Sequence, residues 1–219
     1  IDHEDVLAGA LGRDGRWLAG FAFSLGLVMV LVGGAELFTG NSLMVMAWAD
    51  RRVTLGQLAR NWALVYLGNL AGALGTVLLV WLADLPNGAS AQTAAAIAEA
   101  KGALEPLPAF FRGLLCNVFV CMAVWLSLAA RQVGGKVVAI ALPVAAFVAL
   151  GLEHSVANMC LIPIGQLAGL AEGGTGLDLG GFLANLLPVT AGNVVGGAGL
   201  VAGAYWLVYC RPRTRPTRS

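Results

Sequence analysis

Charge is scarce in this sequence. Of 219 residues, 13 are Lys or Arg and 12 are Asp or Glu, so only 11% are charged and the formal net charge is +1. This balance gives no indication of a nucleic-acid partner. Hydrophobic residues make up 58% of the chain, and the mean hydropathy is +0.80. These values exclude an ordinary soluble domain and predict an integral membrane protein.

Histidine and cysteine are also few, with two and four copies respectively. The four cysteines lack CxxC or His-paired spacing, which indicates small packing residues rather than metal ligands. There is no cluster of metal-ligating side chains and no nucleophile with a base beside it. We therefore expect no metal, no cofactor and no enzymatic activity, and a purely structural membrane protein or an intramembrane enzyme has little support.

The apolar stretches between the charged islands are long. A β-barrel would show alternating segments of about ten residues, so this pattern predicts an all-α bundle forming one transmembrane transport domain over residues 1–219. Two stretches exceed the roughly twenty helical residues that cross a bilayer, so each is predicted to be a pair of half-helices joined by irregular backbone. The stretches cover residues 17–49 (broken), 62–83, 110–130, 137–170 (broken) and 182–209.

An internal repeat lies in the middle of the two long stretches. GAELFTGN, from Gly34 to Asn41, matches GLEHSVAN, from Gly151 to Asn158. The segments that follow, NWALVYLGN and NLLPVTAGN, keep the same asparagine spacing. The repeat indicates a duplicated membrane transport protein with an inverted-repeat architecture.

Basic residues mark one side of the membrane. Arginines or lysines follow the first, third and fifth apolar stretches, and the basic tail over residues 211–219 shares their side. Positive loops face the cytoplasm, so we expect a cytoplasmic carboxyl terminus in the cell inner (plasma) membrane. By alternation the amino terminus then lies outside, and the third stretch has no partner in the repeat. We therefore expect a first helix preceding Ile1, with a genuine five-span protein as the alternative.

Two carboxylates lie within the predicted membrane at the same position of the repeat, Glu36 and Glu153. An ionisable group at that depth is costly unless it is paired or functional. A carboxylate beside a helix break can accept hydrogen bonds from freed backbone N–H groups. We therefore expect Glu36 and Glu153, with Asn41 and Asn158 from the same motifs, to hold the irregular loops in place.

His154 breaks the symmetry of the repeat, because its counterpart in the first copy is Leu37. The backbone arrangement does not require an imidazole here, so His154 is the strongest functional candidate, with a satisfied core histidine as the alternative. A small anion loses its hydration in an apolar constriction, and protonation removes most of that cost. A histidine between apolar gates can therefore protonate a weak-acid anion or attract it.

Five motifs along the chain resemble the formate/nitrite transporter family: AELFTGN, NWALVYLGN, CNVFVCMAVW, LEHSVANM with IPIG, and NLLPVTAGN. The similarity runs from Phe21 to Tyr209. It implies an aquaporin-like bundle of six helices with the second and fifth broken, of which the first is missing from this chain. It also implies homopentamers in the lipid bilayer, with one anion pore per subunit.

The resemblance also implies roles for single residues. The pore and substrate residues are His154, Thr39, Asn117 and Lys101. The apolar constrictions are formed by Phe23, Leu27, Leu37, Phe38, Val120 and Phe147. On sequence alone Lys101 is a solvated loop charge, so its role at the pore mouth follows from the resemblance.

The expected function is passage of small monovalent weak-acid anions together with protons. Formate leads, because IPIG and NLLPVTAGN are more similar to the formate branch than to the nitrite branch of the family. Nitrite and hydrosulfide remain alternatives, since a hydrophobic slit with one histidine separates such anions poorly. A channel for water or neutral solutes is the alternative of another class, although the chain lacks the paired Asn-Pro-Ala motifs.

Overall fold

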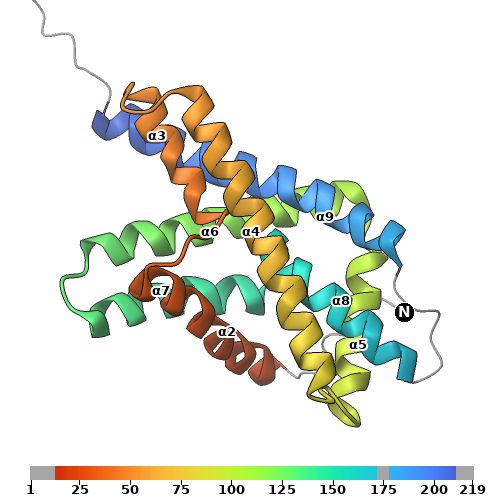
Figure 1. The fold of residues 1–219 in the computed structure, drawn as a ribbon. Coiled ribbons are helices and arrows are strands. Elements are labelled where there is room, and N and C mark those ends of the chain that lie inside the picture. Colours follow the sequence, from red (N-terminus) through yellow and green to blue (C-terminus); the bar gives the residue numbers. More distant parts are fainter. Residues whose placement is uncertain (1–12, 172–177, 211–219) are drawn as a thin grey trace, which may run out of the picture.

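Helices account for nearly all of the structure that the computed structural model describes, which covers residues 13–171 and 178–210 (Figure 1). This confirms the predicted all-α class. The predicted basic tail, residues 211–219, lies outside the described residues. The elements are α2 (Arg13–Gly33), η1 (Gly40–Leu43), α3 (Met44–Ala49), α4 (Leu55–Leu82), α5 (Ala89–Gly102), α6 (Pro106–Ala129), α7 (Val133–Ala149), α8 (Ser155–Ala171), α9 (Leu179–Val194), η2 (Val195–Ala202), α10 (Gly203–Tyr205) and η3 (Trp206–Cys210).

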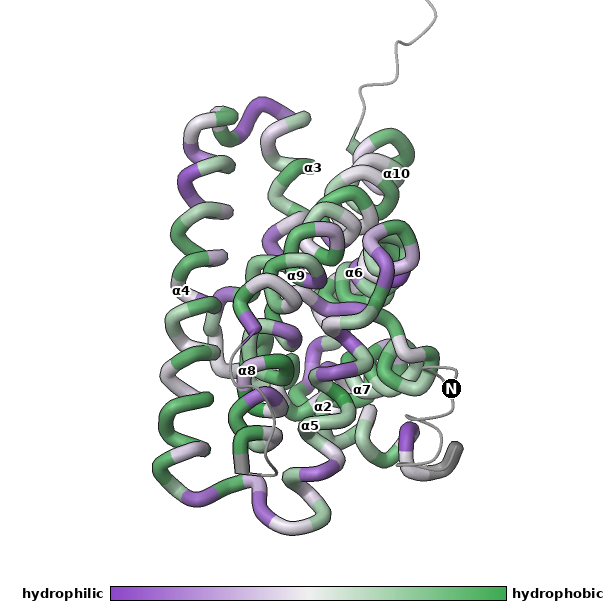
Figure 2. The backbone as a smooth tube through the Cα atoms, turned by 90° about the vertical axis from the view of Figure 1, so that its right-hand side faces the viewer, coloured by the Kyte–Doolittle hydropathy of each residue, from purple (hydrophilic) through white to green (hydrophobic). Residues whose placement is uncertain are grey.

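Four helical segments are long and apolar enough to cross a membrane: Gly15–Gly33, Leu55–Leu82, Pro106–Ala129 and Leu179–Cys210. The last of these is one rod made of α9, η2, α10 and η3. Figure 2 shows that most of the tube is hydrophobic, with hydrophilic stretches at the ends of α4 and a few in the interior near α7 and α8. Interior polar groups in such a protein need partners or a function.

Each of the two long apolar stretches contains a pair of helices. In the first, α2 ends at Gly33 and η1 begins at Gly40, leading into α3. In the second, α7 ends at Ala149 and α8 begins at Ser155. Gly34 and Gly151 begin the repeated motifs, and both have positive φ, 79° and 66°. Glycine adopts this conformation at little steric cost, so the same residue turns the chain in both copies.

The two copies are interleaved rather than side by side. Helix α2 packs along α7, and α8 packs against both α4 and α5. In turn α3 contacts η2, which belongs to the last rod. Helix α6 lies between α7 and the α9 rod, and the core forms where α2, α6 and α7 meet. Its buried members are Leu27, Cys116, Val120, Ala123, Ile140, Val144 and Phe147.

Glycines on helix α4 and on the matched rod of α9 and η2 differ in their surroundings. A Cβ atom at Gly192 would meet the backbone of Phe110, and one at Gly196 the backbone of Leu114. These glycines let the α9 rod approach α6 closely. By contrast, Gly72 of α4 is exposed, and a Cβ atom there would meet nothing within 4 Å. The small-residue spacing on α4 therefore does not serve packing within the described part of the protomer.

Candidate functional site

An asparagine from a neighbouring helix binds the backbone of each break. In the first copy, the Phe38 N–H donates to Asn69 Oδ1 at 2.9 Å, and Asn69 Nδ2 donates to the Glu36 carbonyl at 3.0 Å. In the second copy, the Ser155 N–H donates to Asn193 Oδ1 at 2.9 Å. Asn193 Nδ2 in turn donates to the Glu153 carbonyl at 3.1 Å. Both breaks thus satisfy backbone groups that a continuous helix would have paired internally.

The first carboxylate, Glu36, accepts hydrogen bonds from side-chain amides. Its Oε2 atom accepts from Asn41 Nδ2 at 2.7 Å and from Asn61 Nδ2 at 3.1 Å. Asn41 Nδ2 also donates to Asn61 Oδ1 at 2.9 Å. The carboxylate side chain therefore joins the loop to helix α4, while the Asn69 amide binds the loop backbone.

The second carboxylate, Glu153, has one matching amide donor and a cation as well. Its Oε2 atom accepts from Asn158 Nδ2 at 2.6 Å, and Asn158 Nδ2 also donates to Asn185 Oδ1 at 2.8 Å. Lys101 Nζ lies 2.8 Å from Oε1 and 2.9 Å from Oε2 of Glu153. The side chains of Lys101 and Glu153 are 15% and 6% exposed, so this is a nearly buried ion pair.

Lys101 differs most from its sequence-based description. Residues 89–102 form helix α5 rather than a solvated loop, and Lys101 lies in its last turn. The segment is rich in alanine, the residue with the highest helix propensity, and its small side chains let α5 pack closely on α8. Lys101 is also fixed through its backbone, since its carbonyl accepts from Asn185 Nδ2 at 2.9 Å.

His154 joins the two breaks. Its Nε2 atom lies 2.9 Å from Thr39 Oγ1, across 115 residues of sequence. Its Nδ1 atom lies 3.1 Å from the backbone nitrogen of Ala157, in the first turn of α8. A backbone N–H only donates, so Nδ1 accepts, and the ring is neutral with its proton on Nε2. His154 thus caps helix α8 while donating a hydrogen bond to Thr39 Oγ1.

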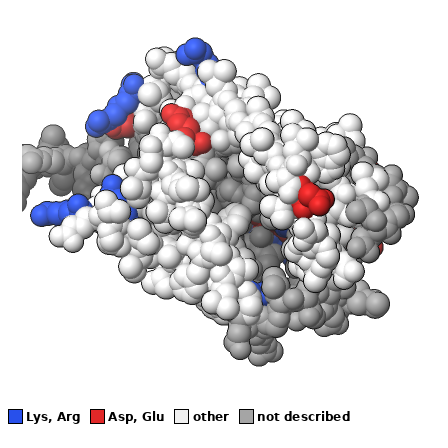
Figure 3. Space-filling model, turned by 60° about the horizontal axis from the view of Figure 1, so that its bottom comes forward, with Lys and Arg blue, Asp and Glu red and all other residues white. Residues whose placement is uncertain are grey.

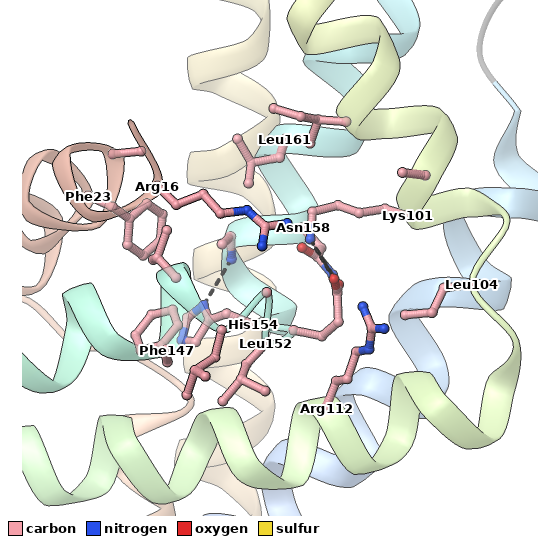
Figure 4. Close-up of a pocket in the computed structure, with 18 residues that line it drawn as sticks. Arg16, Phe23, Lys101, Leu104, Arg112, Phe147, Leu152, His154, Asn158 and Leu161 are labelled. Atoms are coloured by element: carbon pink, nitrogen blue, oxygen red, sulfur yellow. Dashed lines mark hydrogen bonds and ion pairs between the residues drawn. The ribbon is translucent and has the colours of Figure 1, made fainter. Parts of the chain in front are cut away.

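Two aromatic rings stand beside the imidazole (Figure 4). The ring of Phe147 is stacked on His154 with centroids 6.1 Å apart, and it meets Phe23 edge-on at 5.9 Å. The rings come from α7 and α2, the first halves of the two broken stretches. His154 is therefore held against an apolar wall that both copies of the repeat build.

Two cavities meet at this wall. The first, about 250 Å³, has Arg16, Lys101, Arg112 and Glu153 among its lining residues. Figure 3 shows a hollowed face with basic and acidic atoms inside the hollow. The second, about 430 Å³, is lined mainly by apolar side chains of α2, α6 and α7. Both cavities share Phe23, Phe147, His154 and Ala157.

The remaining predicted constriction residues separate into two groups. Leu27, Leu37 and Val120 line the second cavity but not the first. Phe38 lines neither cavity. It packs edge-on against Tyr66, with centroids 4.9 Å apart, and against Trp62 at 6.1 Å.

Asn117 and Thr39 are fully buried and line neither cavity. Asn117 Nδ2 donates to the Thr39 carbonyl at 3.2 Å and to the Asn193 carbonyl at 2.6 Å. Asn117 therefore lies behind Thr39, where it links the two breaks. Thr39 reaches the site through its hydroxyl, which contacts the imidazole.

Sequence reasoning did not single out Arg16, Asn193 or Ala157 as members of the site. Arg16 and Phe23 are seven residues apart on one helix face, a spacing that could have pointed to Arg16. Asn193 ends a recognised motif, so its place beside the second break could have been inferred from the repeat. No sequence signal marks Ala157, because it contributes a backbone N–H.

The all-helical membrane bundle, with two cavities that meet at aromatic rings and a histidine, places this protein in the class of transmembrane transport proteins. The chain belongs to the formate/nitrite transporter family, whose sequence model, described as "Formate/nitrite transporter", matches residues 5–207. It is thus a family channel with formate-channel homologues, not an enzyme, as the sequence predicted.

Relatives and solved structures agree with this assignment. The chain is 42% identical to "Formate channel FocA" of Escherichia coli (strain K12) over 213 residues, 90% of this chain and 75% of that protein. It is 38% identical to "Probable formate transporter" of Methanothermobacter thermautotrophicus, covering 94% and 82%. The structure "Pentameric formate channel with formate bound" superposes with a TM-score of 0.81 at 38% identity, covering 91% of this chain and 85% of that one.

Proposed function

We propose that this chain forms a pore for small monovalent weak-acid anions, with formate as the main substrate. The observation that carries the proposal is the shared wall, where Phe23, Phe147 and His154 separate a charged cavity from an apolar one. The relatives named as formate channels, and a similar structure described as having formate bound, support formate over nitrite and hydrosulfide.

The wall makes passage of a bare anion costly. An anion entering the second cavity from the first exchanges water for the rings of Phe23 and Phe147 and then for Leu27, Leu37 and Val120. Apolar side chains cannot replace the lost hydration. If the anion gains a proton at His154, the species that crosses is a neutral acid, and most of this cost disappears.

The hydrogen bonds of His154 specify what proton transfer requires. The neutral ring can already donate a hydrogen bond from Nε2, and an anion would take the place of Thr39 Oγ1 as its acceptor. An imidazolium needs a proton on Nδ1, and that proton must displace the Ala157 N–H and uncap α8. The charged form therefore gives up a proton readily. Transfer from Nε2 to the anion leaves a neutral ring that carries its proton on Nδ1. Loss of that proton to solvent and uptake of another at Nε2 then restore the hydrogen bond from the Ala157 N–H.

The other polar groups support this step. Asn117 holds the Thr39 carbonyl, so the hydroxyl stays 2.9 Å from the imidazole. Glu153, held by Lys101 and Asn158, fixes the backbone immediately before His154. Glu36 and Asn41 do the same before Thr39 in the first copy. Lys101 lines the first cavity, which in this proposal the anion reaches before His154.

We further propose that the protein is a homopentamer in the cell inner membrane with its carboxyl terminus in the cytoplasm. The pentameric structural relative supports the assembly. The orientation rests on the basic residues after α3 and α6, chiefly Arg51, Arg52 and Arg131. Helix α5 connects the ends of α4 and α6 that lie across the membrane from these arginines, and its residue Lys101 lines the first cavity. In this orientation the first cavity is therefore on the outer side.

Uptake into proteoliposomes tests the proposal. Formate, nitrite, hydrosulfide and water are offered at outside pH values of about 5 and about 8, on either side of the ordinary histidine value of about 6.5. We expect formate flux to exceed the others and to rise at the lower pH. Water flux without anion flux would contradict the proposal and favour a channel for neutral solutes.

Two variants separate a proton carrier from a hydrogen-bond donor. His154→Asn keeps an N-cap acceptor and a side-chain N–H but cannot be protonated. His154→Phe has neither the N-cap acceptor nor the side-chain N–H, and it cannot be protonated either. We expect His154→Asn to abolish the rise in flux at low pH while keeping the pentamer, and His154→Phe to abolish proton-coupled flux. Undiminished low-pH stimulation in His154→Asn would contradict the relay.

A further inference from the structure

The first cavity contains a lysine that is already paired. Lys101 Nζ contacts both carboxylate oxygens of Glu153 at 2.8 and 2.9 Å, and the pair is nearly buried. The two opposite charges largely cancel at the distance of an incoming anion. Removing Lys101 from Glu153 to bind the anion would leave a buried carboxylate without its cation. Another cation must therefore attract the anion into this cavity.

Arg16 lines the same cavity from the opposite side. It lies near the start of α2 and is half-buried, and Figure 4 shows its side chain extending across the cavity toward Lys101 and Asn158. Within residues 13–171 and 178–210, Arg16 forms no ion pair. Arg112 also lines the cavity, where it has interactions of its own. The guanidinium of Arg16 thus faces the space through which an anion would reach His154.

The position of Arg16 fits an anion-binding site in the first cavity, which the anion occupies before it reaches the wall. Arg16, Ala19 and Phe23 all line the first cavity at helical spacing. Seven residues of α-helix rise about 10 Å, so Arg16 lies two turns before Phe23 on the same face. An anion held there lies in the same cavity as His154, on the side of Arg16.

We propose that Arg16 captures the anion in the first cavity and favours anions with two oxygen atoms, such as formate or nitrite, over hydrosulfide. A guanidinium presents two parallel N–H donors that match the two oxygens of a planar carboxylate. A single-atom anion can use only one of them at full strength. Lysine at this position would keep the charge without the fork. This inference rests on the proposed pore for the direction of travel, but anion capture can be measured without transport.

The experiment uses the purified protein with Arg16→Gln, Arg16→Lys and the control Arg131→Gln, an exposed arginine after α6, at the other end of that helix from the cavity. Size-exclusion chromatography first verifies the oligomer. Uptake is measured against formate and hydrosulfide concentration. The rise in unfolding temperature with sodium formate, relative to sodium chloride, reports binding independently of flux.

We expect Arg16→Gln to raise the half-saturating formate concentration about tenfold with maximal flux changed less than about twofold, since loss of a charge-assisted pair is of that order. Arg16→Lys should raise it about threefold for formate and leave hydrosulfide unchanged. Arg131→Gln should match the unaltered protein in both measurements. The formate-dependent stabilisation should disappear in Arg16→Gln.

Several results would overturn the proposal. These are no formate-dependent stabilisation of the unaltered protein, equal half-saturation in Arg16→Gln and Arg131→Gln, or an equal effect of Arg16→Lys on formate and hydrosulfide. Stabilisation by formate that depends on Arg16, without any formate flux, would instead reject the proposed pore and leave the capture site standing.

Discussion

The two breaks of the repeat use the same hydrogen bonds in different surroundings. Glu36 is exposed and accepts hydrogen bonds from the Asn41 and Asn61 amides. Glu153 is 5% exposed and has the matching Asn158 amide together with the ammonium group of Lys101. The exposed carboxylate of the protomer has amide donors alone, whereas the buried one also has a cation, which offsets the cost of burying its charge.

The candidate site contains residues that have no equivalent in the other copy of the repeat. The asparagines and the positive-φ glycines recur in both copies and hold backbone. Lys101 of α5 pairs with the carboxylate of the second copy, and His154 stands where the first copy has Leu37. Thr39 of the first copy meets His154 of the second, so the interleaving of the two copies brings them together. The repeat therefore builds the frame, and its unmatched residues supply the chemistry.

Removing the cation from the second break should have the largest effect. Lys101→Met leaves Glu153 charged and buried, at a cost of about 3 to 5 kcal/mol. We expect a large fall in the unfolding temperature in detergent. The double variant Lys101→Met with Glu153→Gln should recover most of the loss, because the isolated charge is gone. Equal stability of Lys101→Met and the unaltered protein would contradict the buried ion pair.

Glycines on the matched helices give the next contrast. Gly196→Ala places a methyl group against the Leu114 backbone and should destabilise the protein by about 3 kcal/mol. The control Gly72→Ala, on α4, meets nothing within 4 Å and should leave the unfolding temperature unchanged or slightly raised. Unfolding temperatures and oligomer size measure both. Loss of the pentamer in Gly72→Ala alone would show that the α4 glycines serve contacts between subunits.

The asparagines that hold the two breaks should differ by a smaller amount. Asn193→Ala removes bonds to the Ser155 N–H and to the Gly113 and Glu153 carbonyls, all buried, and should cost about 2 kcal/mol. Asn69→Ala removes bonds to the Phe38 N–H and the Glu36 carbonyl and should cost about 1 kcal/mol. Unfolding temperatures rank the two variants. The reverse order would mean that the first break contributes more to stability.

The smallest effect is expected at the exposed carboxylate. Glu36→Gln keeps an acceptor for the Asn41 and Asn61 amides and removes only the charge, so stability should change by less than about 1 kcal/mol. Formate uptake should stay within about twofold. The matched Glu153→Gln should lower the unfolding temperature by clearly more, because the Lys101 ammonium is then left nearly buried without its carboxylate. Equal responses of the two variants would remove the distinction between the breaks.

Much of the fold could be predicted from the sequence because hydropathy and the repeat are local signals. The long stretches contain the helices α2, α7 and α8, and GAELFTGN and GLEHSVAN contain the turns. Helix α5 was not predicted, because its small alanines give no strong apolar pattern. Its packing on α8 decides that Lys101 is buried beside Glu153 rather than solvated.

The candidate site could be predicted only in part. His154 was singled out from the asymmetry of the repeat, and Phe23 and Phe147 through the resemblance; all three line both cavities. Asn117 and Phe38 were expected at the pore, and neither lines either of the two cavities. Which face of a helix turns to a cavity depends on the neighbouring helices, and a single apolar segment carries little information about that face when most of its residues are hydrophobic.

By itself the sequence determined that the chain is a helical membrane protein with a duplicated frame, since the scarcity of charge, the apolar lengths and the repeated Gly-x-Glu motifs are properties of the chain alone. The tertiary structure decided what the polar residues do. Thr39 and His154 are 115 residues apart, and Lys101 and Glu153 are 52 apart. Such contacts form through the interleaved packing of distant helices, so a buried pair and a capped imidazole cannot be read from local pattern.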